Sequence, residues 1–161
     1  MNLLQWLTDS RLGEMVFTLL VSMIPVIELR GGVPFGTALG LPPWAALCAA
    51  VVGNLIPVPF IIVYIRRIFL WLRRRFPKLN RLVDKLERKA HLKGRKVSKY
   101  KYLGLFVFVA IPLPGTGAWT GALIAAFLNI RLRHALPAIT LGLLIAGSLV
   151  TLMTLGLIHL L

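Results

Sequence analysis

Acidic residues, histidine and cysteine are all scarce here: the 161 residues include five Asp and Glu against nineteen Lys and Arg, three His and one Cys. The histidines, His91, His134 and His159, have no spacing typical of a metal site. Cys48 stands alone, so neither an intrachain disulfide nor a Cys–His nucleophile pair can form. No Walker or dinucleotide-binding loop is present, which excludes ATP-driven pumping by this chain. We therefore expect no enzyme, no metal and no cofactor.

Apolar residues, by contrast, are abundant, at 58% of the chain, and the mean hydropathy is +0.82. Crossing a bilayer takes roughly 20 apolar residues, and four stretches are that long. Residues 43–65 carry no charge and residues 135–161 only one histidine, whereas 18–43 and 102–130 are interrupted. Residues 1–11 lack a basic start, so we expect no cleaved signal peptide. The sequence predicts an all-α integral membrane protein.

Positive charge is concentrated in one segment, because fifteen of the nineteen basic residues lie between Arg66 and Lys101. A short basic loop of this kind is typical of the cytoplasmic side of a membrane protein. Aromatic residues flank the charged run without interleaving, so we expect contacts with anionic lipid headgroups and no nucleic acid partner. From Pro77 the apolar residues have helical spacing, which predicts a helix that ends near Gly94. We favour a solvated connector over a helix that lies on the inner leaflet or packs against a partner chain.

Both interrupted stretches contain proline and glycine at high density. Glu28 and Arg30 lie in VSMIPVIELRGGVPFG, and the second break, IPLPGTGAW, starts at Ile111. These residues release backbone N–H and C=O groups that lipid cannot satisfy, and ionisable groups at membrane depth indicate function. A broken helix in each half of a short membrane protein is typical of a transporter site.

The arginines after the second break decide between two topologies. If residues 102–130 cross the membrane, Arg131 and Arg133 lie outside, against the positive-inside rule. If the segment folds back at its Pro/Gly turn, both arginines stay inside. We therefore predict a multi-pass protein of the cell (inner) membrane whose termini both lie outside. The alternative is a plain four-span bundle with two kinked helices.

The predicted architecture is an inverted repeat of a re-entrant helical hairpin plus a transmembrane helix, joined by a basic cytoplasmic linker helix. One transmembrane domain, 1–161, comprises a hairpin (14–42), a span (43–65), the linker (66–101), a second hairpin (102–130) and a second span (133–161). Two spans and two hairpins are too few helices to cover the polar backbone groups that the breaks release. Neighbouring chains must help to cover them, so we expect a homo-oligomer, most simply a dimer. Small residues on the first span suit close helix approach: Ala45, Ala46, Ala49, Ala50 and Gly53.

The candidate substrate- and ion-binding residues all lie near the two breaks. They are Glu28, Arg30, Gly31, Pro34, Pro112, Pro114, Gly115, Thr116, Gly117, Trp119 and Thr120. Removal from water disfavours a charged carboxylate, which suits Glu28 to carry a proton. Positions i and i+2 do not face each other on a regular helix, so Glu28 and Arg30 can meet only where the backbone is broken between Glu28 and Gly32, which the glycines permit.

The second break and one buried amide each allow two interpretations. Gly115 and Gly117 permit positive φ, so successive N–H groups could form an anion-binding nest. Alternatively the segment is a tight turn whose threonines satisfy freed carbonyls. Asn54 is a lone amide in the middle of a span, where we favour a hydrogen bond between helices over a ligand role.

The strings IPVIELRGGVPFG and PLPGTGAWTGALI resemble the small multidrug export family of prokaryotic membrane proteins, which is similar to the DedA (VTT, SNARE-associated) superfamily of lipid scramblases and flippases. The resemblance implies two re-entrant helices that face each other, each followed by a span, and a transport role linked to the proton-motive force. Glu28 matches the acidic motif of DedA proteins. Their arginine motif has no counterpart around Pro112, so Arg30 is the nearest candidate to bind an anionic headgroup.

Together these observations predict a secondary transporter or lipid flippase, proton-coupled, with a midplane site between the two re-entrant helices. Its partners would be membrane lipids, protons or another small ion, a small substrate and further copies of the chain. The alternative is a non-transporting assembly or lipid-binding module, in which the pair of Glu28 and Arg30 is structural.

Overall fold

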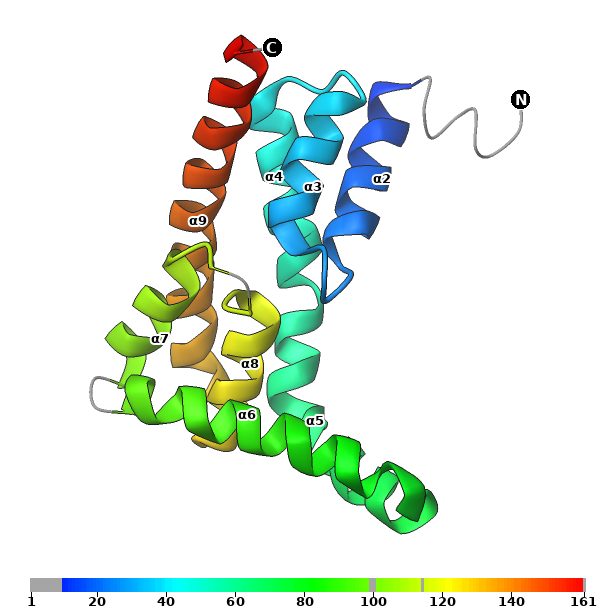
Figure 1. The fold of residues 1–161 in the computed structure, drawn as a ribbon, viewed down its shortest axis with the longest axis vertical. Coiled ribbons are helices and arrows are strands. Elements are labelled where there is room, and N and C mark those ends of the chain that lie inside the picture. The colour runs from blue at the N-terminus through cyan, green and yellow to red at the C-terminus, as the bar shows by residue number, and fades with distance from the viewer. Residues whose placement is uncertain (1–9, 99–100, 114, 161) are drawn as a thin grey trace. The chain divides into compact units, whose positions relative to one another are not determined.

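The computed structural model describes residues 10–98, 101–113 and 115–160 (Figure 1). Its elements follow in chain order. They are α2 (Arg11–Ser22), α3 (Glu28–Ala38), α4 (Pro43–Leu55), α5 (Pro57–Arg75), the 3-10 helix η1 (Pro77–Leu79), α6 (Asn80–Ser98), α7 (Lys101–Ala110), α8 (Ala118–Phe127) and α9 (Leu132–Leu160). The chain divides into two compact units, and the long segment α4–α5 and helix α9 each contribute to both. The first unit is Met1–Pro57 with Leu143–Leu161, and the second is Val58–Gly142.

In the first unit, α2 and α3 form a hairpin that packs on α4 (Figure 1). With 12 and 11 residues, these helices rise only about 18 and about 16 Å, against the roughly 30 Å of a bilayer core. Small residues bring the hairpin together. A Cβ on Gly36 would lie 2.8 Å from the Thr18 hydroxyl and 3.0 Å from Ala46, and one on Gly32 would collide with Ser22. This G-x-x-x-G face therefore serves close packing within the chain.

The end of α3 is a Schellman motif. Gly40 has φ +107°, the amide of Leu41 donates to the carbonyl of Gly36, and that of Gly40 donates to Thr37, both at 3.1 Å. Pro43 then occupies the first turn of α4, where its missing N–H costs nothing. The chain thus reverses between α3 and α4 in four residues.

In the second unit, α7 and α8 pack together and against the first part of α9. A Cβ on Gly121 of α8 would lie 2.7 Å from Val109 of α7, and one on Gly142 of α9 would lie 2.8 Å from Val109. Helix α8 also ends in a Schellman motif, this time around Asn129 at φ +54°. The amide of Ile130 donates to Ala125 at 2.9 Å, and the Asn129 side chain accepts a hydrogen bond from Arg66.

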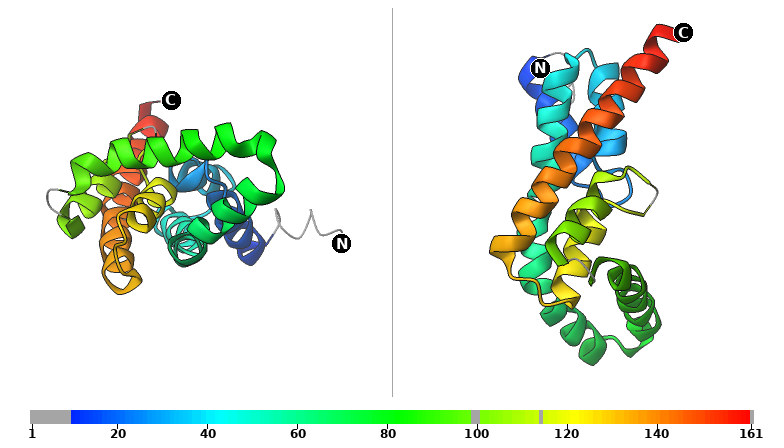
Figure 2. Two further views of the ribbon diagram at one scale, coloured as in Figure 1. Left: turned by 90° about the horizontal axis from the view of Figure 1, so that it is seen from below. Right: turned by 90° about the vertical axis from the view of Figure 1, so that its left-hand side faces the viewer.

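Helix α6 lies across the second unit, from the end of α5 to the start of α7 (Figure 2). Part of its apolar stripe is buried: Val83 and Ala90 are covered where α6 packs on α7 and α8, whereas Leu82 and Leu92 are exposed. Charged residues of α6 contact α5 as well, since Arg73 of α5 binds Asp84 at 2.6 Å and Glu87 at 2.8 Å. The choice between a solvated connector and a helix on the inner leaflet or a partner chain therefore stays a prediction.

The predicted end of the linker helix at Gly94 is wrong, because α6 continues to Ser98. One glycine inside a helix costs only about 1 kcal/mol, which flanking helix-forming residues offset. The helix that begins in the first predicted span continues beyond residue 65 to Arg75, and the bounds of the span itself stay a prediction. Arginine is a good helix former, and the helix ends only before Pro77, whose ring restricts the preceding residue.

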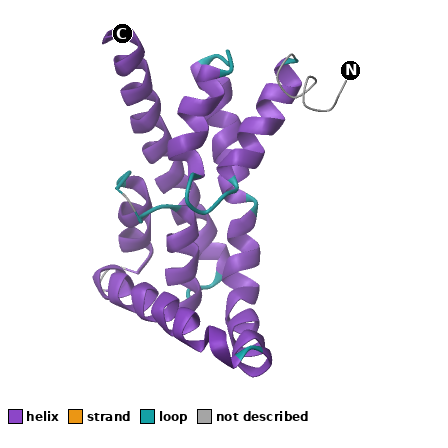
Figure 3. Ribbon diagram, turned by 45° about the vertical axis from the view of Figure 1, so that its right-hand side comes forward, coloured by secondary structure: helices purple, strands orange, loops and turns teal. Residues whose placement is uncertain are grey.

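Two helical segments are long and apolar enough to cross a membrane among the described residues: Pro43–Arg75, with 33 residues, and Leu132–Leu157, with 26. Helices and loops make up the whole of the described chain, in which no strand occurs (Figure 3). The predicted all-α class is confirmed. Re-entry of the hairpins and the inverted repeat stay predictions.

Candidate functional site

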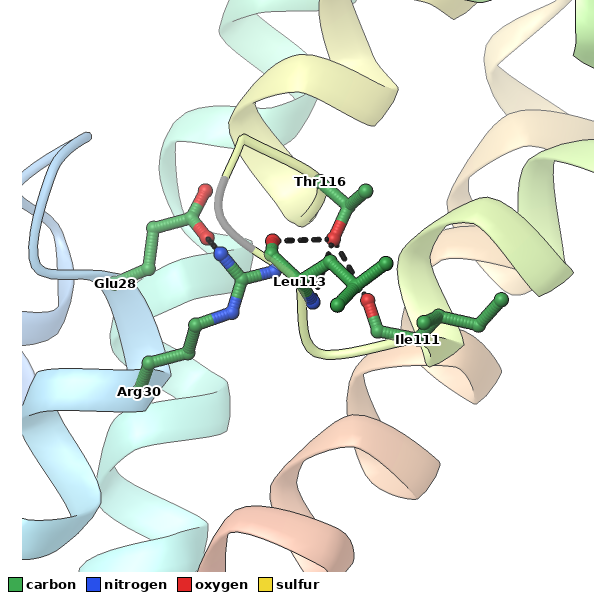
Figure 4. Close-up of polar contacts among 5 residues, drawn as sticks. All are labelled: Glu28, Arg30, Ile111, Leu113 and Thr116. Carbon is green, nitrogen blue, oxygen red and sulfur yellow. Dashed lines mark hydrogen bonds and ion pairs between the residues drawn. The ribbon is translucent and has the colours of Figure 1, made fainter.

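The first turn of α3 holds Glu28 and Arg30 side by side. Arg30 Nη1 lies 3.9 Å from Glu28 Oε2 (Figure 4), although i and i+2 on a regular helix point apart. The backbone break that brings them together is at Glu28 itself, which has φ +50°. Gly31 and Gly32, which we expected to provide the break, lie within the regular part of α3.

A left-handed conformation is rare for glutamate and costs on the order of 1–3 kcal/mol unless its surroundings enforce it. Here the segment between α2 and α3 enforces it. The amide of Glu28 donates to the carbonyl of Ile24 at 2.9 Å, and that of Ile27 donates to the same carbonyl at 3.1 Å. Glu28 is also only 4% exposed. A strained, buried carboxylate in a membrane protein is a candidate for function.

No other charge lies near this pair in the described part of the first unit. Helix α4 and the part of α9 from residue 143 to 157 contain no charged residue. Helix α2 has two, Arg11 and Glu14, both in its first turn, at the end opposite the segment that leads to Glu28. Arg30 is therefore the counter-charge that the described part of the first unit supplies to Glu28.

The neighbouring candidates, Gly31 and Pro34, shape α3. A Cβ on Gly31 would collide with the side chain of Ile27, so this glycine allows the turn to pack against the helix. Pro34 lies inside α3 and has no N–H to donate to the carbonyl one turn earlier. The Thr37 hydroxyl bonds the carbonyls of Val33 at 3.1 Å and Pro34 at 2.8 Å.

In the second unit, the segment between α7 and α8 is a turn organised by Thr116. Its hydroxyl lies 2.7 Å from the carbonyl oxygens of both Ile111 and Leu113, and it accepts from the Leu113 amide at 3.2 Å (Figure 4). This is what the tight-turn interpretation expects of a threonine. Both glycines adopt the positive φ that glycine permits, at +80° for Gly115 and +126° for Gly117. An anion-binding nest stays a prediction.

The remaining candidates of this segment lie on either side of Thr116. Pro112 precedes the turn and is partly buried, and Pro114 lies outside the described residues. Trp119 and Thr120 occupy the first turn of α8 and are partly buried. Glu28 belongs to the first unit and Thr116 to the second, so a shared site at the membrane midplane stays a prediction.

Asn54 was not among the site residues predicted from the sequence. This residue of α4 is completely buried, and neither its amide nitrogen nor its amide oxygen has a hydrogen-bond partner in the described structure. The expected hydrogen bond between helices is therefore not formed. The sequence feature that could have identified Asn54 is a polar amide in an otherwise apolar helix, close to Pro57.

Two broken helical hairpins beside two long apolar helices define a class, that of helical membrane proteins with interrupted helices. The family described as "Putative small multi-drug export protein" matches residues 28–149, about three quarters of the chain. The chain belongs to this family, and the match begins at Glu28, inside the first break, and includes the whole of the second. No curated protein and no solved structure matches the chain significantly.

Proposed function

We propose that this protein is a proton-coupled secondary transporter of the cell (inner) membrane, in which Glu28 exchanges a proton during the transport cycle. One observation carries the proposal. The buried carboxylate of Glu28 is held in a strained backbone conformation, 3.9 Å from Arg30, with no other charge in the described interior of its unit. A family described by export supports transport over an enzymatic or purely structural role.

The chemistry follows from the two protonation states of Glu28. When ionised, the carboxylate is balanced by Arg30, which lowers the cost of burying both charges. When protonated, the pair is broken and the guanidinium becomes available. An amphipathic cation would compete with Arg30 and with the proton for the same carboxylate. Competition of this kind couples outward movement of the cation to inward movement of a proton.

Two further parts of the proposal concern the membrane arrangement. We infer that α2–α3 and α7–α8 are re-entrant hairpins, because none of these helices is long enough to cross a bilayer core. We also infer an inverted repeat. Both hairpins end in a Schellman motif, around Gly40 and Asn129, and a long helix follows each within a few residues. In this arrangement the linker is cytoplasmic, and a relation to the DedA superfamily would be expected.

A lipid flippase is the second candidate. Arg30 favours it, because a partly buried guanidinium suits a phosphate headgroup. The two candidates differ in what would be moved: a fluorescent phospholipid across the bilayer in one case, a soluble cation in the other.

The proposal is tested in proteoliposomes with an imposed pH gradient and ethidium as the cationic probe. Glu28→Gln keeps the shape of the side chain but cannot ionise, so we expect at least a tenfold loss of gradient-driven uptake with the fold intact. Glu14→Gln, which removes the acidic residue in the first turn of α2, is the matched control and should transport normally. Normal transport by a folded Glu28→Gln protein contradicts the proposal. Fluorescent-lipid translocation without ethidium movement favours the flippase.

A further inference from the structure

The side-chain amide of Asn54 lowers the stability of the fold, because it is buried without a hydrogen-bond partner in the described residues. Its side chain is 0% exposed, and both polar atoms lack a hydrogen-bond partner in the described residues. A buried amide without a partner destabilises a fold, so natural structures rarely keep one without a use. Two other buried polar side chains of the unit differ in this respect. The Thr18 and Ser22 hydroxyls each donate to a carbonyl one turn earlier, at 2.7 Å.

The packing of α3 on α4 shows what lies level with this amide. The helices are antiparallel, and a Cβ added to Gly36 would lie 3.0 Å from Ala46, while one added to Gly32 would lie 3.4 Å from Ala50. Each step of four residues back along α3 thus corresponds to four residues forward along α4. One further step pairs Glu28 with Asn54. Both residues are buried and belong to the same unit.

We propose that Asn54 is the hydrogen-bond partner of Glu28 in its protonated state. The inference rests on the proposed proton exchange at Glu28. An amide offers one acceptor and a donor group, so its ideal partner both donates and accepts. An ionised carboxylate only accepts and a guanidinium only donates. A neutral carboxyl group does both, through its O–H to the Asn54 carbonyl oxygen and through its C=O from the Asn54 amide nitrogen.

The site then has two arrangements. The ionised carboxylate pairs with Arg30, as observed at 3.9 Å, and leaves the amide without a partner. The protonated group releases Arg30 and pairs with Asn54 across the interface of α3 and α4. Neither α2 nor α4 brings a competing titratable group to this level: α4 contributes only the exposed Cys48, and Arg11 and Glu14 lie in the first turn of α2, at its far end.

The experiment follows the protonated Glu28 directly, by infrared difference spectroscopy of the reconstituted protein as the pH is lowered. A carboxylic acid C=O band that is absent from Glu28→Gln identifies the group. In Asn54→Leu, we expect this band at higher wavenumber, because its hydrogen bond is lost. Half-maximal intensity should require a pH lower by about one unit, since one hydrogen bond favours the protonated form by about tenfold. Asn54→Gln keeps the amide and should restore part of the shift.

Stability provides the second measurement. Because Asn54→Leu removes an unsatisfied polar group from the interior, we expect its melting temperature at neutral pH to rise by about 2–4 °C. Thr18→Val, at a buried side chain whose hydroxyl is already satisfied, is the control and should leave the infrared band unchanged. An unchanged band in Asn54→Leu, or failure of that protein to assemble, overturns the inference. Glu28→Gln transport, measured separately, decides the proposed function.

Discussion

At the scale of single residues, two features of Glu28 destabilise the fold, and Arg30 offsets one of them. Glu28 adopts a left-handed backbone and buries a carboxylate, both of which cost free energy. Arg30 offsets the second cost, because its Nη1 lies 3.9 Å from Glu28 Oε2. The pair thus balances the buried charge within the first turn of α3.

This geometry predicts how Arg30 tolerates substitution. Arg30→Lys keeps the charge that balances the Glu28 carboxylate and loses only the planar fork, which charge balance alone does not need. We expect ethidium transport within about twofold of wild type. Arg30→Met leaves the Glu28 carboxylate without its counter-charge and should lower the free energy of unfolding by about 1–3 kcal/mol. Thermal unfolding in detergent checks the second expectation. Loss of transport in a well-folded Arg30→Lys protein would show that the fork is needed.

Sequence reasoning identified the pair but not the cause of its proximity. The need for a break between Glu28 and Gly32 followed from helix geometry alone. The location of the break could not be predicted in this way, because glutamate has no preference for positive φ, whereas the neighbouring glycines adopt it readily. Turn hydrogen bonds to Ile24 decide the position, and such bonds depend on how α2 ends.

At the scale of helices, small residues hold each hairpin together. We expected Ala45, Ala46, Ala49, Ala50 and Gly53 to serve close helix approach, and all are buried. Ala46 and Ala50 lie against α3, and Gly53 against the backbone of Leu19 in α2. The stripe thus packs on helices of the same chain.

A dimer stays a prediction, which now rests only on the need to cover broken backbone.

Gly36 provides the sharpest test of this packing. A Cβ there would lie within 3.0 Å of Thr18 and Ala46, so Gly36→Ala must push α3 away from its neighbours. We expect a loss of about 1–3 kcal/mol in unfolding free energy. Gly156→Ala is the matched control, because a Cβ at that position would have nothing within 4 Å. That change should be neutral or stabilise by up to about 1 kcal/mol, through helix propensity. Equal melting temperatures for the two variants would contradict close packing at Gly36.

The ends of helices were the least predictable features. The turn at Gly40 could be anticipated from Gly before Pro, but Asn129 takes the same left-handed role without a glycine. Gly94, by contrast, was expected to end a helix and does not, because a helix interior tolerates a lone glycine when both flanks favour helix. Local composition therefore located the breaks and missed some boundaries.

At the scale of the whole molecule, family membership and two long apolar segments establish a membrane protein. Residues 66–98 include the end of α5, η1 and α6, and most of the basic charge of the chain lies there. Which side of the membrane this charge faces follows from the positive-inside rule and stays a prediction.

Cysteine labelling tests the topology. Cys48 is exposed, so it is first replaced by Ala to remove the native thiol. A cysteine at position 131 should then resist a membrane-impermeant maleimide in intact cells and react after permeabilisation, because a re-entrant α7–α8 keeps that residue inside. Labelling of position 131 in intact cells would show that residues 102–130 cross the membrane.

Proton movement through Glu28 is the central claim, and the most direct measurement is the internal pH of proteoliposomes loaded with pyranine. When ethidium is added outside without a pH gradient, exchange through wild-type protein should carry protons out and raise the internal pH as ethidium enters. Glu28→Gln, reconstituted at equal density, should show neither change. Ethidium entry at a constant internal pH, or a normal pH rise with Glu28→Gln, would contradict the account.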